Sequence, residues 1–309
     1  MPPPMSDGPV QIRKVGLFLV LTFGISWTVA VLFVLLGLDL STLRGTVLVV
    51  VGYMSAPAIA ALVTQRWSGD PIRTGCGLVR GRLRWSVLAW LTPVGLLGLT
   101  IGIGTLLPGV TITTDYATFL RGLGLPEAQI EASLTALEAV PLPVPVFFVL
   151  QGLVTGLTIN ALAALGEELG WRGLLLRELS PLGFWRVSFL TGLVWGIWHA
   201  PLIVQGHNFP DAPYVGIVVM TAWTITVTPV FTYLAVRAQS VLAPTLLHGS
   251  FNAVASLSLV YLTGAGTLLV GPVGVAGIGA GLVATGVCVL HDRYVPATRL
   301  TTGGLLQME

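Results

Sequence analysis

The sequence predicts an all-α polytopic integral membrane protein with about eight transmembrane helices and both termini in the cytoplasm. An apolar composition, long uncharged runs and an uneven distribution of arginine predict this fold. Of the 309 residues, 54% are hydrophobic and only 9% are charged, whereas a typical soluble domain carries about 25% charged residues. Such a chain cannot cover a water-facing surface with polar groups, so we expect a lipid bilayer around it.

Eight stretches are long and apolar enough to cross a bilayer, which takes roughly 20 residues per helix. They are Val15–Leu36, Thr46–Thr64, Ser86–Leu107, Val144–Leu165, Val187–Val204, Tyr214–Val236, Val241–Leu262 and Thr267–Leu290. The fourth stretch can continue as a helix to Leu176. The first run exceeds the roughly 7–15 residues of a signal-peptide core, so we expect it to remain as a helix.

The positive charges predict the orientation of these helices, because cytoplasmic loops are rich in Lys and Arg. With an even number of spans, one side carries Arg13, Lys14, Arg66, Arg73, Arg80, Arg82, Arg84, Arg177, Arg186, Arg237, Arg293 and Arg299. The other side carries only Arg44 and Arg121. Both termini are therefore placed in the cytoplasm, and the protein in the plasma membrane.

The chain divides into a disordered tail at 1–14, helices one to three with an outside loop at 15–143, a core at 144–262, a last helix at 263–290 and a tail at 291–309. The outside loop, 108–143, is expected to contain a short amphipathic helix. Because no run is rich in Lys or Arg, nucleic acid is not an expected partner. Cys76 and Cys288 have neither metal-ligand nor disulfide-framework spacing. The sequence carries no signal for an oligomeric state.

Ionisable residues inside a span cost about 2.5–3.5 kcal/mol each on insertion scales, so they mark cavities or chemistry. The acidic pair Glu167 and Glu168 lies on the continuation of the fourth span. Arg172 follows Glu168 at i+4, on the same helix face, where the two can pair. Glu167 has no such partner and is the carboxylate free for chemistry.

Two histidines lie within predicted spans. His199 follows Trp195 at i+4 in the fifth span, and His248 precedes Asn252 at i+4 in the seventh. At about 1.5 Å rise per residue, His199 and His248 reach depths similar to that of Glu167. We expect them to meet in one cavity open to the cytoplasm. His207 and His291 are expected to be solvated residues outside the spans.

These residues resemble the motifs of the CPBP family of intramembrane proteases. The family includes the type II CAAX prenyl endopeptidases and bacterial bacteriocin-processing or self-immunity proteins. Glu167-Glu168-x-x-x-Arg172, Trp195-x-x-x-His199 and His248-x-x-x-Asn252 occur in the family's order, within Val144–Leu262. The second motif usually begins with Phe, and here it begins with Trp195. The resemblance implies peptide-bond hydrolysis of a membrane-associated or prenylated, CAAX-like substrate.

The resemblance also implies a role for each motif residue. Glu167 is the expected general base, and His199 holds or polarises the attacking water. His248 and Asn252 are expected to hydrogen-bond the developing oxyanion.

The remaining motif residues are expected to support these four. Glu168 and Arg172 form an ion pair that holds the glutamate helix, and Trp195 packs against the active-site helices.

A zinc ion bound by Glu167, His199 and His248 is the alternative, which would make the protein a metalloprotease. The His-Glu-x-x-His zinc signature is absent, so the metal-free mechanism without a cofactor is favoured.

The expected partners are the bilayer and a peptide or membrane-protein substrate. The other functions considered are an inactive scaffold or bacteriocin-immunity protein of the same fold, and a transporter.

Overall fold

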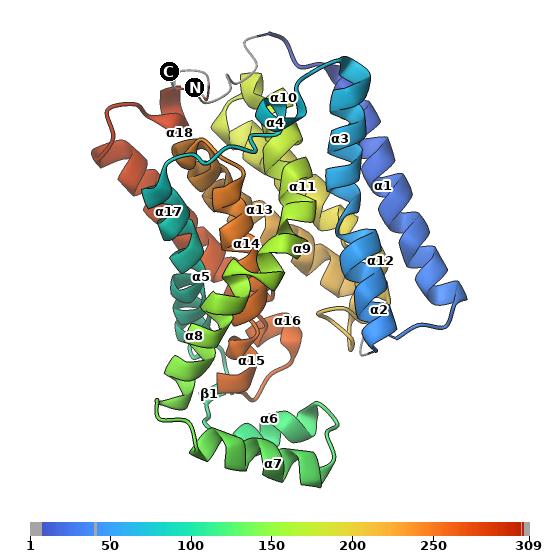
Figure 1. The fold of residues 1–309 in the computed structure, drawn as a ribbon. Coiled ribbons are helices and arrows are strands. Elements are labelled where there is room, and N and C mark those ends of the chain that lie inside the picture. Colours follow the sequence, from blue (N-terminus) through green and yellow to red (C-terminus); the bar gives the residue numbers. More distant parts are fainter. Residues whose placement is uncertain (1–7, 40–41, 304, 306–309) are drawn as a thin grey trace.

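The computed structural model describes residues 8–39, 42–303 and 305, and the chain forms a bundle of helices (Figure 1). The first half contains α1 Ile12–Leu35, α2 Leu43–Val47, η1 Leu48–Tyr53, α3 Ala56–Ser68, α4 Ile72–Gly75, α5 Leu83–Gly104, β1 Thr111–Ile112, α6 Tyr116–Gly122, α7 Glu127–Glu138 and α8 Val144–Leu157. The second half contains α9 Ile159–Glu168, η2 Leu169–Leu175, α10 Leu176–Glu178, η3 Ser180–Leu182, α11 Phe184–Trp198, α12 Ala200–Val204, α13 Pro213–Ala238, α14 Leu242–Val254, α15 Leu257–Tyr261, β2 Leu262–Thr263, α16 Thr267–Val270, α17 Val275–Tyr294 and α18 Leu300–Gly303. The two short strands pair antiparallel.

The predicted all-α polytopic membrane fold is confirmed. Among the described residues, six helical segments are long and apolar enough to cross a bilayer. A seventh span results if α8 and the helix from Ile159 to Glu178, which meet at a bend of 53°, count as one. The predicted number of eight is not confirmed, because the stretch Val241–Leu262 breaks into α14 and α15.

Helix α14 does not have to cross the whole bilayer, because other parts of the protein surround it. It packs on α5, α8 and α9, and most of its residues are buried. Its backbone approaches its neighbours closely: a Cβ at Gly249 would lie 2.6 Å from the Gly156 carbonyl oxygen and 2.7 Å from the Ala161 nitrogen. Small residues allow such contacts between membrane helices. Gly249 therefore allows α14 to lie directly against the helix that carries the glutamate pair.

The fourth predicted span is bent where it was expected to be continuous. The bend is at Thr158, whose hydroxyl donates to the Val154 carbonyl oxygen at 3.0 Å. Such a bond back to the preceding turn bends helices. The helix then continues to Glu178, and its segment Leu169–Leu175 is a π-helix that begins directly after Glu168. π-helical segments in proteins frequently mark functional sites.

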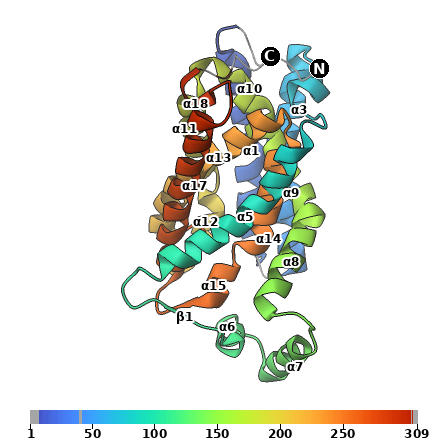
Figure 2. The same cartoon turned by 90° about the vertical axis from the view of Figure 1, so that its left-hand side faces the viewer.

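Connections at one end of the bundle bring distant parts of the chain together; we call this the termini end. Here the Lys14 ammonium contacts Asp70 at 2.7 Å and Glu178 at 2.6 Å. Arg237 at the end of α13 pairs with Asp292 near the end of α17. The start of α1 and the end of α17 lie at the same end of the bundle (Figures 1 and 2).

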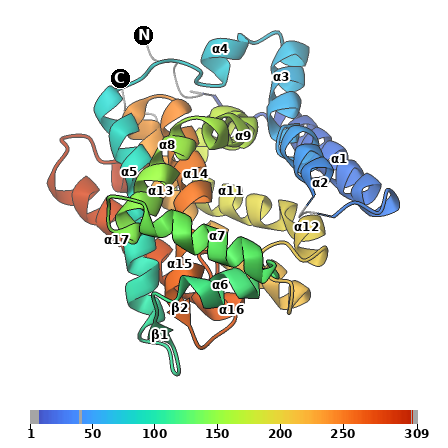
Figure 3. The same ribbon diagram turned by 60° about the horizontal axis from the view of Figure 1, so that its bottom comes forward.

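The opposite end, which we call the α6–α7 end, carries α6, α7, α15 and α16 (Figure 3). The loop at 108–143 contains two short helices where the sequence predicted one. Of the predicted disordered tail, residues 1–7 lie outside the described residues. Residues 12–14 already belong to α1, so the predicted end of the tail was three residues too late.

Candidate active site

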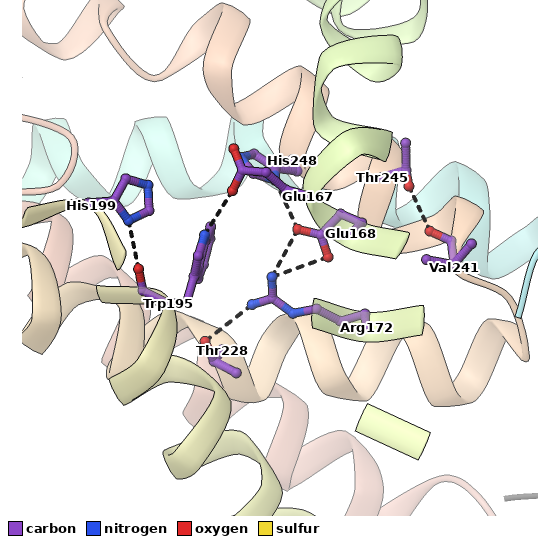
Figure 4. Close-up of polar contacts among 9 residues, drawn as sticks. All are labelled: Glu167, Glu168, Arg172, Trp195, His199, Thr228, Val241, Thr245 and His248. Carbon is purple, nitrogen blue, oxygen red and sulfur yellow. Dashed lines mark hydrogen bonds and ion pairs between the residues drawn. The ribbon is translucent and has the colours of Figure 1, made fainter. Parts of the chain in front are cut away.

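The glutamate pair lies in the interior, at the end of α9. Only 2% of Glu167 and none of Glu168 is exposed. The two carboxylates turn to different partners, as Figure 4 shows. Each must be satisfied by protein groups, because an isolated buried charge is very costly.

Glu168 makes contacts that link three helical segments. Its carboxylate oxygens accept hydrogen bonds from Arg172 Nη1 at 2.9 and 3.1 Å, so the predicted i, i+4 pair is present. The same carboxylate lies 2.9 Å from His248 Nδ1. A carboxylate only accepts, so Nδ1 carries the proton, and the Nε2 of His248 is left for other partners. Glu168 therefore fixes the orientation of His248, a contact that the sequence did not predict.

Arg172 is completely surrounded by protein. Its Nη2 donates to the Thr228 hydroxyl at 3.2 Å. Its guanidinium carbon also lies 4.4 Å from the ring centre of Trp195 and 4.3 Å from that of Phe231. Aromatic rings attract a desolvated cation by about 2 kcal/mol or more. These contacts stabilise the positive charge that balances Glu168.

Trp195 does more than the packing that the sequence predicted. Its indole Nε1 donates to Glu167 Oε2 at 2.9 Å. The phenylalanine that usually begins this motif has no such donor. The hydrogen bond therefore fixes one oxygen of Glu167 and leaves the other for a different partner. The one feature of the sequence that could have indicated this hydrogen bond is the tryptophan in place of the usual phenylalanine. From the sequence, that difference suggested only a change of packing.

His199 lies at the C-terminal end of α11. Its Nδ1 is 2.8 Å from the Trp195 carbonyl oxygen. Since a carbonyl oxygen only accepts, Nδ1 carries the proton and Nε2 presents a lone pair. A neutral imidazole in this tautomer can accept a hydrogen bond from water.

A cavity of 290 Å³ brings together the four residues predicted to be catalytic: Glu167, His199, His248 and Asn252. Asn252 is exposed, one turn beyond His248 on α14. The apolar part of the wall includes Val49, Met54, Trp198, Leu202, Met220, Trp223, Phe251 and Val273. The cavity therefore joins a polar inner end to an apolar wall.

Three connections between helices also contribute residues to the cavity wall. Its wall includes His207 and Asn208 between α12 and α13, Ser256 between α14 and α15, and Pro272 between α16 and α17. These connections lie at the α6–α7 end (Figures 1 and 3). The predicted opening of the cavity to the cytoplasm stays a prediction, because the lining residues do not show which side of the membrane these connections face.

His207 is a cavity residue that the sequence analysis assigned to a solvated loop. It lines the wall from the loop after α12. Burial lowers the pKa of its imidazole, so His207 is neutral at pH 7. Nothing in the local sequence distinguishes this position from a solvated one, since the packing of the loop decides it.

The predicted zinc ligands do not form a coordination site in this geometry. Among the described residues, no group of three or more His, Cys, Asp and Glu side chains is arranged to hold a metal ion. The Nδ1 atoms of His199 and His248 are engaged with protein oxygens. Hydrogen bonds at Nδ1 leave both Nε2 atoms available, which is also how zinc-binding histidines are held, so the choice between general-base chemistry and a zinc site stays a prediction.

Comparison with known proteins supports the resemblance seen in the motifs. Residues 148–254 match the family model described as type II CAAX prenyl endopeptidase Rce1-like. A segment of 49 residues, 16% of this chain, is 43% identical to CAAX prenyl protease 2 of Methanococcus maripaludis. It covers 18% of that protein, so the match extends over less than a fifth of the relative's length. The resemblance is confirmed for the part of the chain that holds the motifs from Glu167 to Asn252.

Replacement of Glu168 tests the buried network. In Glu168→Gln, Arg172 loses its charge partner in the interior, and breaking such a pair typically costs about 3–5 kcal/mol. We expect a clear loss of thermal stability in detergent, measured by melting of the purified protein. Glu127→Gln is the control, because Glu127 pairs with Arg121 at 2.8 Å on the surface with 64% of its side chain exposed. That variant should melt like the wild type; equal losses in both variants would contradict the network.

Proposed function

We propose that the protein is an intramembrane endopeptidase in which Glu167 activates a water molecule to hydrolyse a peptide bond of a membrane-associated substrate. The observation that carries the proposal is the cavity that joins Glu167, His199, His248 and Asn252. The match to a family of prenyl endopeptidases over this segment supports the same activity. The alternatives, an inactive scaffold, an immunity protein or a transporter, are not favoured by any of these observations.

The reaction begins with a water molecule between Glu167 and His199. Glu167 takes a proton from the water while the His199 Nε2 lone pair accepts its other hydrogen. The water oxygen attacks the carbonyl carbon of the substrate and forms a tetrahedral oxyanion. The carbon–nitrogen bond then breaks as Glu167 returns its proton to the leaving amine. The products are a carboxylic acid and an amine, and the enzyme regains its starting state.

In this mechanism, two side chains on α14 stabilise the oxyanion. The Asn252 amide donates without carrying a charge. His248 donates from Nε2 when both of its ring nitrogens are protonated, and the Glu168 carboxylate at 2.9 Å from Nδ1 stabilises that form. Donors fixed before the reaction lower the barrier because they need no reorganisation.

Glu167→Gln should abolish turnover because an amide cannot take the proton from water. The measurement is cleavage of a peptide library by the purified protein in liposomes, followed by mass spectrometry. Melting of the variant should stay close to that of the wild type, since the amide preserves the shape of the side chain. Near-normal cleavage by Glu167→Gln would overturn the assignment of the base.

Trp195→Phe removes the indole N–H and keeps an aromatic ring over Arg172. We expect kcat to fall by about tenfold or more, with a smaller change in KM, because the lost hydrogen bond positions the base and does not bind substrate. Kinetics on the best-cleaved library peptide measure both constants. If Trp195 serves only for packing, Trp195→Phe will keep its kcat and Trp195→Ala alone will lose activity.

The Asn252→Ala variant, compared with His248→Ala, distinguishes stabilisation of the oxyanion from binding of a zinc ion. Loss of one oxyanion donor typically lowers kcat by about 10²–10³, and Asn252→Asp should be at least as damaging because it repels the oxyanion. Metal analysis of the wild type, Asn252→Ala and His248→Ala accompanies the kinetics. Stoichiometric zinc in the wild type that is required for activity, and lost in His248→Ala, would show that the metal-free mechanism is wrong.

A further inference from the structure

The position of His199 depends on how the helix before it ends. Helix α11 ends at Trp198, and Pro201, two residues beyond His199, has no amide hydrogen to continue the helix. The amide of Leu202 donates to the His199 carbonyl oxygen at 3.1 Å. In a continuous helix this amide would donate to the carbonyl oxygen of Trp198. That oxygen is therefore open to donors from other parts of the protein.

Two side chains from the N-terminal helices donate to this oxygen. The hydroxyl of Tyr53, the last residue of η1, donates to the Trp198 carbonyl oxygen. The indole Nε1 of Trp27 on α1 donates to the same oxygen at 3.4 Å. This carbonyl belongs to the peptide bond between Trp198 and His199. The two donors therefore fix the backbone that carries the His199 ring.

The side chain of Trp198 is held by the same two helical segments. Its indole Nε1 donates to the Ser26 hydroxyl at 2.8 Å, and that hydroxyl donates to the Tyr53 carbonyl oxygen at 3.3 Å. The ring centres of Trp198 and Tyr53 lie 4.5 Å apart, and the Trp198 ring meets the His199 ring edge to face at 4.9 Å. Ser26, Tyr53 and Trp198 are all buried. The backbone and the ring of Trp198 are thus both fixed by residues outside α11.

The residues that follow Tyr53 also pack against the helix of the glutamate pair. A Cβ at Gly166, the residue before Glu167, would lie 2.8 Å from the Met54 carbonyl oxygen and 3.2 Å from the Cα of Ser55. Met54 also lines the cavity. The junction of η1 and α3 therefore contacts α9 beside the proposed base and α11 beside the histidine proposed to hold the water.

We propose that Tyr53 and Ser26 are positioning residues of the active site, which hold His199 in the place and tautomer in which its Nε2 faces the attacking water. The inference rests on the proposed function and adds to it two residues outside 148–254, the segment that matches the family model. Neither residue belongs to the described cavity wall, so both act through Trp198. A group that holds the attacking water accelerates the reaction only while it is correctly oriented.

Tyr53→Phe tests the role of the hydroxyl, because it keeps the ring against Trp198 and removes the donor. Tyr233→Phe is the matched control: Tyr233 is also buried, its hydroxyl lies 2.6 Å from His291 Nδ1, and it does not belong to the described cavity wall. We expect kcat of Tyr53→Phe to fall by about tenfold with little change in KM, because the displaced imidazole affects the attacking water and not the binding of substrate. Tyr233→Phe should keep the kcat of the wild type on the same best-cleaved library peptide.

Nitrogen NMR of the histidine rings in liposomes gives a second measurement that needs no turnover. The His199 signals are assigned by their loss in His199→Gln. In the wild type and in Tyr233→Phe we expect one tautomer with the proton on Nδ1, in agreement with the 2.8 Å contact to the Trp195 carbonyl oxygen. In Tyr53→Phe and in Ser26→Ala we expect a mixture of both tautomers, because the ring is no longer held against that oxygen.

The proposal requires both changes in Tyr53→Phe. An unchanged His199 spectrum overturns it, even if the melting temperature or kcat is lower, because Tyr53 would then act only on the stability of the fold or through another residue. A changed spectrum with the kcat of the wild type overturns it as well, since the position of His199 would not matter for the reaction. If no peptide is cleaved even by the wild type, the proposed function fails, and the spectrum still decides whether Tyr53 positions His199.

Trp27→Phe is the second variant if Tyr53→Phe cannot be purified in folded form. It removes the other donor to the Trp198 carbonyl oxygen, from a side chain that is 40% exposed. It should change kcat and the His199 spectrum in the same direction and to a smaller extent, because its hydrogen bond is the longer one. A spectrum identical to that of the wild type would contradict the proposal.

Discussion

The shared contact of Glu168 with Arg172 and His248 is the interaction on which the rest of the site depends. A carboxylate with no exposed surface is stable in a membrane protein only if its charge is balanced and its oxygens are hydrogen-bonded. Arg172 supplies the balance, and His248 gains a fixed orientation from the same oxygen. One buried ion pair thus connects the π-helical segment η2 with α14.

The network extends through an aromatic ring to Glu167, the proposed general base. Arg172 lies against Trp195, and Trp195 donates its indole hydrogen to Glu167. Thr228 on α13 accepts from the other side of the guanidinium. The two adjacent glutamates therefore have separate tasks although they share one environment: Glu168 holds the structure together, and Glu167 is left facing the cavity with one oxygen fixed.

The sequence predicted what depends on short spacing and on composition. Uncharged runs predicted the membrane helices, and the i, i+4 spacing predicted the pair of Glu168 with Arg172. Contacts between helices could not be predicted from the sequence, since packing determines them. The interior position of α14 follows from the close approach at Gly249. The position of His207 on the cavity wall follows from the packing of a loop. The hydrogen bond from Trp195 to Glu167 depends on the relative rotation of two helices, which no local pattern specifies.

The short length of α14 has a consequence for the second reactant, which is water. Thirteen residues at about 1.5 Å each extend roughly 20 Å, whereas the hydrocarbon core of a bilayer is about 30 Å thick. The cavity lies beside the C-terminal end of this helix, where Phe251 and Asn252 line its wall. Hydrolysis consumes one water molecule per bond, and hydrocarbon dissolves almost none. In the proposed reaction, the cavity beside Glu167 supplies this water to a buried carboxylate while lipid still surrounds the rest of the bundle.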